Sequence, residues 1–370
     1  MARLPRGMSE YKGRIRYQFT EAGKRYSVYG QTVKECREKE LEKRKEIEQG
    51  LNSRGKNQTM NNFYDKWVDN RRGTVKGNTL RTNNSLWGMI KGVDVGGTKF
   101  GMLKMLEVTP DDIRALQKGL TEKHSTRTAN DCIALVRSMF KSAVNDRMTT
   151  WNPCNGIKRL KQVEEPARDT IHRALSKEET ARFLKEAKDR NSYYYPLYCF
   201  LLQTGCRIGE AGAITSADIK DDVLFVQRTI TRDELCTYEI GTDAKTNAGR
   251  RNIPLTKGAL DAIKTQKMYN AALQGKVRNI NRLIFVAPRG GMIKSENVGR
   301  DMAAICEKIG IEKITPHAFR AIFATRCIES GMQVKTLQEV LGHTDVKMTL
   351  QLYAHCMIAD KTAQVMAVNF

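Results

Sequence analysis

The chain has 370 residues, enough for two or three domains, and its 40% hydrophobic content is ordinary for a folded protein. Lys and Arg number 63 against 41 Asp and Glu, which gives a net charge of +22. This excess favours a polyanionic partner, with nucleic acid ahead of an anionic membrane. No apolar run approaches the roughly 20 residues that a spanning helix needs, and the basic N-terminus lacks the apolar stretch of a secretory signal, so we expect no membrane partner.

The cysteines, nine in all, are scattered between Cys36 and Cys356, and no two of them have Cys-x-x-Cys spacing. This pattern argues against zinc ribbons and redox motifs and favours free thiols in a reducing cytosol. We therefore expect a cytoplasmic nucleic-acid-binding protein that holds no metal and no cofactor.

Residues 1–56 are predicted to form a small basic module. Residues 14–19 alternate between polar and apolar side chains, as a half-buried strand does, and Arg25–Gly30 predicts a second strand. The capping box Thr32–Glu35 opens a charged helix that ends near Gln49. Such a sheet can lie in a DNA groove, although a solvated sheet covered by a helix is the alternative. The candidate DNA-binding residues are Arg14, Arg16, Lys24 and Arg25.

Residues 57–160 are predicted to be helical. Large apolar side chains recur at helical spacing, first around Phe63 and Trp67. Thr109–Asp112 begins another helix, with Pro at an early position and acids in the first turn. Ser125–Arg147 is the longest amphipathic run, and an interdomain linker is predicted over residues 161–174.

A glycine pair interrupts this helical region. Val93–Lys99 resembles the phosphate loop of certain sugar kinases, which follows a strand and begins a nucleotide-binding domain. Here the segment lies between helical stretches, with no alternating run before it. We therefore predict a flexible loop rather than a nucleotide site.

Residues 175–370 are predicted to form the third and largest unit. A capping box at Ser176 opens a helix to about Asp189, and Tyr195–Thr204 is a second, apolar helix. Two strands are predicted at Val223–Thr231 and Arg250–Leu255, joined through a turn region at residues 247–249. Beyond Gly258 the periodicity is helical almost to the end.

This third unit carries the groups that would cut a phosphodiester without metal. That reaction needs a nucleophile in line with phosphorus, cations on the non-bridging oxygens, and an acid for the departing oxygen. Arginine suits the oxygens because its planar fork stays charged and binds them bidentately. Thr204-Gly205 stops an apolar helix and presents Arg207 at the start of the next one, and Glu210 is placed to pair with nearby groups.

Four further motifs follow in order along the chain. Lys245 lies at the tip of a predicted hairpin, from which it could reach a leaving oxygen. His317 and Arg320 have the i, i+3 spacing that puts both on one helix face. His343 follows Leu341-Gly342, and Tyr353 comes ten residues later.

Each of these residues taken singly has an ordinary explanation. The arginines and the lysine could be surface ion-pair or solvated residues, and the histidines could belong to helix ends. Tyr353 could be a core aromatic, and His355 has no required role. The order of the series, with each member in its expected local context, makes a chance assembly remote.

In this order the motifs resemble the tyrosine recombinase (phage-type integrase) family over most of residues 175–360. The matching motifs are Thr-Gly-x-Arg-x-Gly-Glu, Lys-Thr before Arg-Arg-x-Ile-Pro-Leu, His-x-x-Arg, Leu-Gly-His and the tyrosine. Residues 57–160 resemble the core-binding domain of that family, and residues 1–56 look like the arm-binding domain of integrases from conjugative transposons and related phages. The resemblance implies a mainly α fold with small β elements, in three domains.

The resemblance also implies a role for each motif residue. Arg207 and Arg320 would bind the scissile phosphate, assisted by His317. Lys245 would be the general acid for the 5′-oxygen, and His343 would hydrogen-bond the phosphate. Tyr353 would form a 3′-phosphotyrosyl bond and Glu210 would be a supporting acid. The sequence departs from the family pattern at Ala321, where another histidine is common, and at Ser216-Ala217, which replaces an aromatic.

We expect double-stranded DNA, at core and arm recombination sites, to be the partner of a homo-tetramer that exchanges C-terminal tails. A host DNA-bending protein and an excisionase are candidate accessory partners, and the location would be the bacterial nucleoid. Two alternatives stay open at this point. A type IB topoisomerase uses a similar set of residues without a defined site, and a DNA-binding repressor could have lost catalysis.

Overall fold

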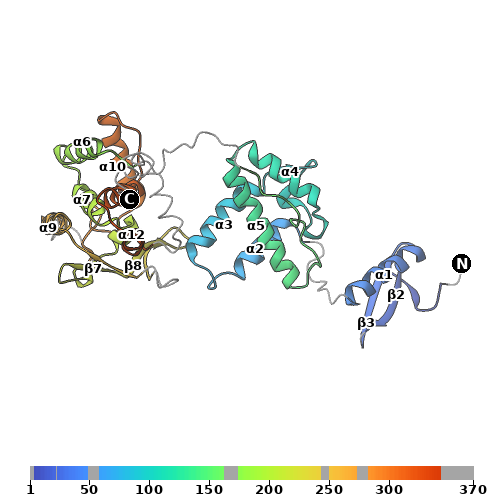
Figure 1. Ribbon diagram of the computed structural model, residues 1–370. Coiled ribbons are helices and arrows are strands. Elements are labelled where there is room, and N and C mark those ends of the chain that lie inside the picture. Colours follow the sequence, from blue (N-terminus) through green and yellow to red (C-terminus); the bar gives the residue numbers. More distant parts are fainter. Residues whose placement is uncertain are drawn as a thin grey trace, which may run out of the picture. The chain divides into compact units, whose positions relative to one another are not determined.

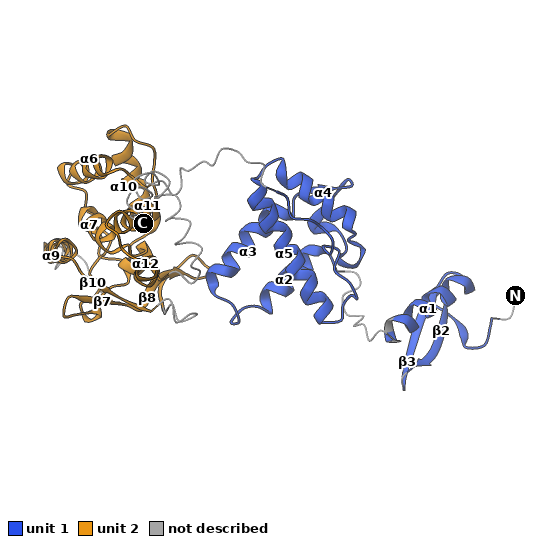
Figure 2. Ribbon diagram, viewed as in Figure 1, with its two compact units in different colours: residues 1–163 blue, residues 164–370 orange. Residues whose placement is uncertain are grey.

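The computed structural model describes six stretches of the chain: residues 4–21, 23–48, 58–161, 174–242, 250–272 and 282–342. The chain divides into two compact units, residues 1–163 and 164–370 (Figures 1 and 2). Both are built mainly from helices with small antiparallel sheets, which confirms the mainly α fold with small β elements. Within the described residues, no helix combines the length and apolar character needed to cross a membrane.

The first unit begins with a three-stranded sheet and one helix. The strands β1 (Met8–Tyr11), β2 (Arg14–Glu21) and β3 (Lys24–Gly30) pair in that order, and α1 (Val33–Glu48) follows. The two longer strands and the helix agree with the sequence prediction. β1 was not predicted because four residues are too few to establish an alternating pattern.

The two faces of this sheet differ in what covers them. α1 contacts β2 and β3 on the face that holds Phe19 and Val28, and the Arg44 guanidinium lies 4.6 Å from the Phe19 ring. Strand alternation puts Arg14 and Arg16 of β2 on the opposite face, together with Arg25 of β3, which pairs with Thr20. These residues leave that face basic.

The second part of this unit is a helical cluster with its own core. Its helices are α2 (Met60–Asp69), α3 (Gly77–Ile90), α4 (Pro110–Thr121) and α5 (Thr126–Asn145). The Tyr64 and Trp87 rings stack with centroids 4.6 Å apart in that core. The helix predicted to begin at Thr109–Asp112 is present, with Pro110 in its first turn, and Thr109 also forms a capping box with Asp112, which was not predicted.

The prediction of a flexible loop at Val93–Lys99 is wrong. The chain makes a short hairpin there, β4 (Asp94–Val95) with β5 (Thr98–Lys99). Gly96 and Gly97 turn it with φ of 63° and 83°, which is the backbone that a tight two-residue hairpin turn requires. Strands of two residues carry no periodicity, so the turn glycines were the only signal in the sequence.

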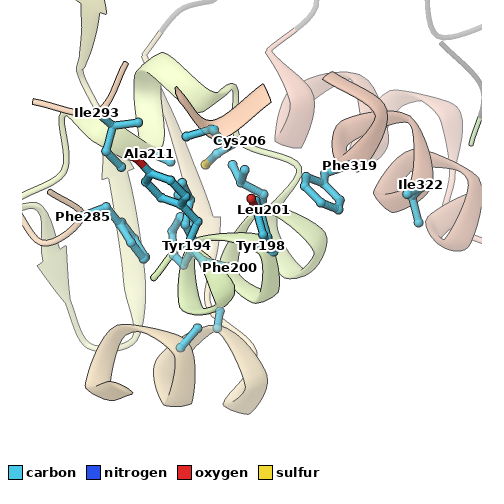
Figure 3. Packing of buried hydrophobic residues seen from close by; sticks show 14 of the residues in the cluster. Tyr194, Tyr198, Phe200, Leu201, Cys206, Ala211, Phe285, Ile293, Phe319 and Ile322 are labelled. Atoms are coloured by element: carbon cyan, nitrogen blue, oxygen red, sulfur yellow. The ribbon is translucent and has the colours of Figure 1, made fainter. Parts of the chain in front are cut away.

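The second unit packs its helices around α7 (Tyr195–Thr204). In this core the buried ring of Tyr198 packs against Phe319 and that of Phe200 packs against Phe285 (Figure 3). The capping box at Ser176 is present, as predicted. The other helices are α6 (Lys177–Asp189), α8 (Ile208–Gly212), α9 (Lys257–Ala272), α10 (Ser295–Lys308), α11 (Pro316–Glu329) and α12 (Val334–Leu341).

The predicted strand Val223–Thr231 is wrong as a single element. It is divided into β7 (Val223–Val226) and β8 (Arg228–Arg232), which belong to different sheets. β7 lies between β6 (Ile219–Lys220) and β10 (Arg251–Pro254).

The partner of β8 is a strand that the sequence did not predict, β9 (Tyr238–Thr242). β9 is therefore the strand before Lys245, and β10, in the other sheet, is the strand after it. The predicted pairing of Val223–Thr231 with Arg250–Leu255 holds for its β7 half alone. The predicted turn at residues 247–249 lies outside the described residues.

Candidate active site

Arg207 owes its position to the glycine before it. Gly205 ends α7 in the left-handed conformation, with φ of 61°, and a Cβ atom there would lie 2.4 Å from the Phe323 ring. Glycine alone satisfies both the backbone and the space. The chain then turns into α8 with Arg207 as its N-terminal cap residue, as the Thr-Gly stop predicted. Cys206 and Ala211 pack into the core on either side of this turn (Figure 3).

Glu210 is a buried carboxylate held by two arginines. Arg251 Nη1 and Nη2 donate to its two oxygens at 3.0 and 2.7 Å, and Arg207 Nη1 donates to Oε1 at 2.8 Å. The Arg207 backbone N–H donates to Oε2 at 2.8 Å. Burial acts to raise the pKa of Glu210, but the hydrogen bonds and charge of Arg251, followed by the charge of Arg207, outweigh it and lower the pKa to about 2. Glu210 is therefore ionised at neutral pH.

Arg320 is the second buried cation of the site. It lies in the second turn of α11 and is 3% exposed. Its Nη1 donates to the Gly205 carbonyl at 2.9 Å, and its Nη2 donates to the Leu341 carbonyl at the end of α12. Burial, and next the nearby charge of Arg207, lower the pKa of Arg320 to about 9. Burial and the charge of Arg207 thus disfavour the positive charge of Arg320, and an anion bound beside it would stabilise that charge.

The charges of this cluster do not balance. Among the described residues, this cluster contains one carboxylate, Glu210, and three guanidiniums, those of Arg207, Arg251 and Arg320. Its positive charges therefore exceed its negative charges by two. The Arg207 side chain is 41% exposed, so part of this excess is open to solvent. A phosphate oxygen arriving at Arg207 would meet a cationic site on a rigid base.

Arg251 is a site residue that sequence reasoning missed. It had been noted as part of a motif, without a role. The exposed and buried residues of β10 alternate, and Arg251 occupies a buried position together with Ile253. An arginine at an inward position of an alternating strand is a signal that could have identified it, because a buried guanidinium requires a partner.

His317 lies on the same helix as Arg320, as predicted, in the first turn of α11. Its side chain is exposed, whereas that of Arg320 is buried. The structure thus brings Arg207, Glu210 and Arg320 together and places His317 one turn away along the helix. The predicted residues Lys245, His343 and Tyr353 lie outside the described residues.

The ends of the segments that lead to these three residues are fixed. Gly342 caps α12 in the left-handed conformation, and the preceding carbonyls of Val340 and Leu341 accept from Arg251 and Arg320. Two guanidiniums at a helix C-terminus also complement its dipole. The chain therefore enters His343 from a helix end that is bound to the arginine cluster.

The β8–β9 hairpin is docked against the same cluster. A Cβ atom on Gly209 would lie 2.7 Å from Thr229 Oγ1 and 3.0 Å from the Ile230 carbonyl, so α8 approaches β8 closely. At the start of β9, the Tyr238 hydroxyl donates to Glu296 Oε2 of α10 at 2.6 Å. The strand that leads toward Lys245 is thus fixed at its start.

Comparison with known proteins identifies the family of this chain and two relatives that match most of its length. The profile of the Phage integrase family matches residues 173–358. The transposase of transposon Tn916 from Enterococcus faecalis is 26% identical over 347 residues, which cover 90% of this chain and 83% of the relative. A XerC-like tyrosine recombinase of Caldanaerobacter subterraneus is 24% identical, over 98% of this chain and 96% of that protein.

Solved structures share the fold. The Tn1549 transposon integrase in complex with transposon right end DNA has a TM-score of 0.68 at 24% identity, over 84% of this chain and 99% of that one. A lambda integrase tetramer bound to a Holliday junction has a TM-score of 0.59 at 19% identity, over 92% and 96%.

The family profile and the tyrosine recombinase relative identify a DNA strand-cleaving and strand-rejoining recombinase. The chain belongs to the phage integrase family. It is a site-specific recombinase.

Proposed function

We propose that this recombinase integrates and excises a mobile element through a 3′-phosphotyrosyl intermediate on Tyr353. The observation that carries the proposal is that Arg207 and Arg320 converge at the turn between α7 and α8, where Arg320 binds the Gly205 carbonyl and Arg207 binds Glu210. The relatives from transposons Tn916 and Tn1549 support the mobile element as the substrate.

Each proposed catalytic residue supplies one requirement of the reaction. Arg207 and Arg320 hold the non-bridging oxygens as charge develops on them, and Glu210 keeps Arg207 oriented. His317 assists at the phosphate from the first turn of α11. Lys245 serves as the general acid and His343 donates a hydrogen bond to the phosphate.

The chemical step conserves the energy of the phosphodiester. The Tyr353 oxygen bonds to phosphorus as the bond from phosphorus to the 5′-oxygen breaks. The phenol proton passes to water, and the 5′-oxygen gains a proton from Lys245. Free tyrosine has a pKa of about 10, so the phenol must lose its proton during attack, which the surrounding cations favour. Attack by the 5′-hydroxyl of a partner strand reverses the step, so rejoining requires no ATP.

The proposed layout has three domains. Residues 1–56 bind a distal arm site, residues 57–160 bind the core site, and residues 175–370 carry the catalysis. Residues 161–174 link the two larger domains. The separate cores of the helical cluster and of the catalytic unit support this division.

The exposed face of the N-terminal sheet gives a prediction about arm binding. In Arg14→Gln/Arg25→Gln, the slope of log affinity against log salt on arm DNA should fall by about 2, because each lost phosphate contact removes about 0.9. Both side chains are exposed on the face away from α1. The double variant Lys34→Gln/Arg37→Gln removes the same charge from α1 and should leave the slope unchanged; equal losses in both variants would point to a general charge effect.

We propose that four copies assemble on DNA and exchange C-terminal tails, Ala354–Phe370. The tail is rich in apolar residues after the last motif, and the lambda integrase tetramer on a Holliday junction supports this assembly. A chain that lacks residues 360–370 should bind single sites normally and form fewer paired complexes in native gels. Unchanged pairing would count against tail exchange.

The accessory partners and the location follow from the substrate. A host DNA-bending protein would bring arm and core sites together for one subunit, and an excisionase would set the direction of the reaction. The protein would act in the bacterial cytoplasm, at the nucleoid, where its DNA lies.

The proposed function is tested with DNA that the protein selects. Random duplexes captured covalently by the full chain would identify the site, and plasmids with two, one or no copies would then be compared. We expect recombinant products from paired sites alone. Relaxation of site-free supercoiled plasmid would indicate a topoisomerase, and binding without covalent capture would indicate a repressor.

A further inference from the structure

Arg251 joins three parts of the catalytic unit that are distant in sequence. Its Nη atoms bind both oxygens of Glu210 in α8, 41 residues away. Its Nε donates to the Val340 carbonyl in α12, at 2.6 Å and 89 residues away. Its own strand, β10, is the first element after the segment that carries Lys245. Glu210, Val340 and β10 each lie a few residues along the chain from a residue of the proposed chemistry.

The geometry of the Glu210 pair restricts Arg207. A carboxylate bound by both arms of one guanidinium is fixed in its plane, so it cannot rotate about its terminal bond. Its Oε1 then presents a single direction to Arg207 Nη1, at 2.8 Å. The Arg251 side chain is 5% exposed and that of Glu210 is 1% exposed, so water does not loosen this arrangement.

Stability alone gives a weak reason for such a pair. Two buried charges lose their hydration, and apolar side chains of similar size often support a fold as well or better. Partners that orient a functional group, in contrast, cannot be replaced by apolar side chains. The hydrogen bonds of Arg251 to Glu210 and to the Val340 carbonyl are those expected of a residue that orients its neighbours.

We propose that Arg251 is a positioning residue, which sets the direction of Arg207 through Glu210 and the position of the α12 C-terminus through the Val340 carbonyl. This proposal rests on the proposed function, since it assigns Arg251 a part in the same strand cleavage. Arg251 itself does not touch the phosphate.

The test uses full-length protein and a suicide duplex of the selected site in single-turnover cleavage. Arg251→Met should cleave about 10- to 100-fold more slowly, the usual range for the loss of an orienting partner. Its affinity for uncleaved DNA should stay within about threefold, because the phosphate contacts of Arg207 and Arg320 depend on orientation less in binding than in the transition state.

A second substrate separates orientation of Arg207 from loss of structure. A methylphosphonate at the scissile position is uncharged, so a well-placed Arg207 contributes less to its cleavage. We expect the rate gap between wild type and Arg251→Met to shrink by about tenfold on this substrate. A gap of the same size on both substrates would overturn the proposal, as would a folded Arg251→Met that cleaves the phosphodiester at the wild-type rate.

Two further variants complete the design. Arg326 of α11 is a matched control because it too binds both oxygens of a carboxylate, Glu329, and one backbone carbonyl, Leu175. Arg326→Met should cleave like the wild type.

If Arg251→Met does not fold, the double variant Glu210→Leu/Arg251→Leu takes its place. It leaves no unpaired carboxylate and should cleave as slowly as Arg251→Met is expected to; a folded double variant that cleaves at the wild-type rate overturns the proposal. Absence of covalent product with the wild type would instead reject the proposed function.

Discussion

Arg320→Lys should slow single-turnover cleavage by about 10²- to 10³-fold, the usual effect of losing one transition-state donor. Lysine retains the charge but has no planar fork. It cannot bind the Gly205 and Leu341 carbonyls together and still direct a donor at the phosphate, as the arginine can. Affinity for uncleaved DNA should change little, because the charge is conserved.

The control for this prediction lies on the same helix. Arg326→Lys makes the same exchange on α11 at a side chain that pairs with Glu329, and its cleavage rate should match the wild type. Both variants are compared by quenched-flow cleavage of the suicide duplex and by fluorescence binding. An Arg320→Lys protein that cleaves within threefold of the wild type would remove Arg320 from the transition state.

Glu210→Gln should cost about 3–5 kcal/mol of unfolding free energy, as expected when one partner of a buried ion pair is lost. The substitution removes the negative charge that Arg251 binds and that favours the buried charge of Arg320. Urea unfolding at pH 7 measures this loss. Glu329→Gln removes a carboxylate that is 42% exposed and paired with Arg326, and it should cost about 0–1 kcal/mol. Equal losses in the two variants would contradict the buried pairing.

The same carboxylate predicts a pH dependence. The pKa of Glu210 is lowered to about 2 in the folded protein, from 4.5. Its stabilisation, about 3 kcal/mol, is therefore fully present above pH 4.5 and is lost as the pH falls toward 2. The stability gap between wild type and Glu210→Gln should narrow over that window. A gap that stays constant from pH 6 to pH 3 would show that Glu210 is not the group that titrates.

Local signals in the sequence predicted the parts of the fold that local interactions fix. The capping box at Ser176 marked a helix start because a side chain and a backbone group three residues apart satisfy each other. The early proline and the first-turn acids marked the helix start at Thr109–Asp112. The Thr-Gly stop before Arg207 was likewise local. Of the site, these signals predicted Arg207, Glu210 and the shared helix of His317 and Arg320.

Tertiary pairing decided what the sequence could not predict. β9 contains Gly241, and no turn glycine or asparagine precedes it in residues 233–237, so its pairing with β8 left no local pattern. Arg251 was missed for a related reason. Its partners Glu210 and Val340 lie in α8 and α12, and only the folded chain brings those segments to β10.

The account depends on one arrangement, in which the guanidiniums of Arg207 and Arg320 act on the same phosphorus as the phenol of Tyr353. The most direct test is mass spectrometry of the covalent product from a suicide duplex after proteolysis. The predicted result is a 3′-phosphoryl group on the peptide that contains Tyr353, and no adduct from Tyr353→Phe. An adduct on another residue, or one that persists in Tyr353→Phe, would contradict the account.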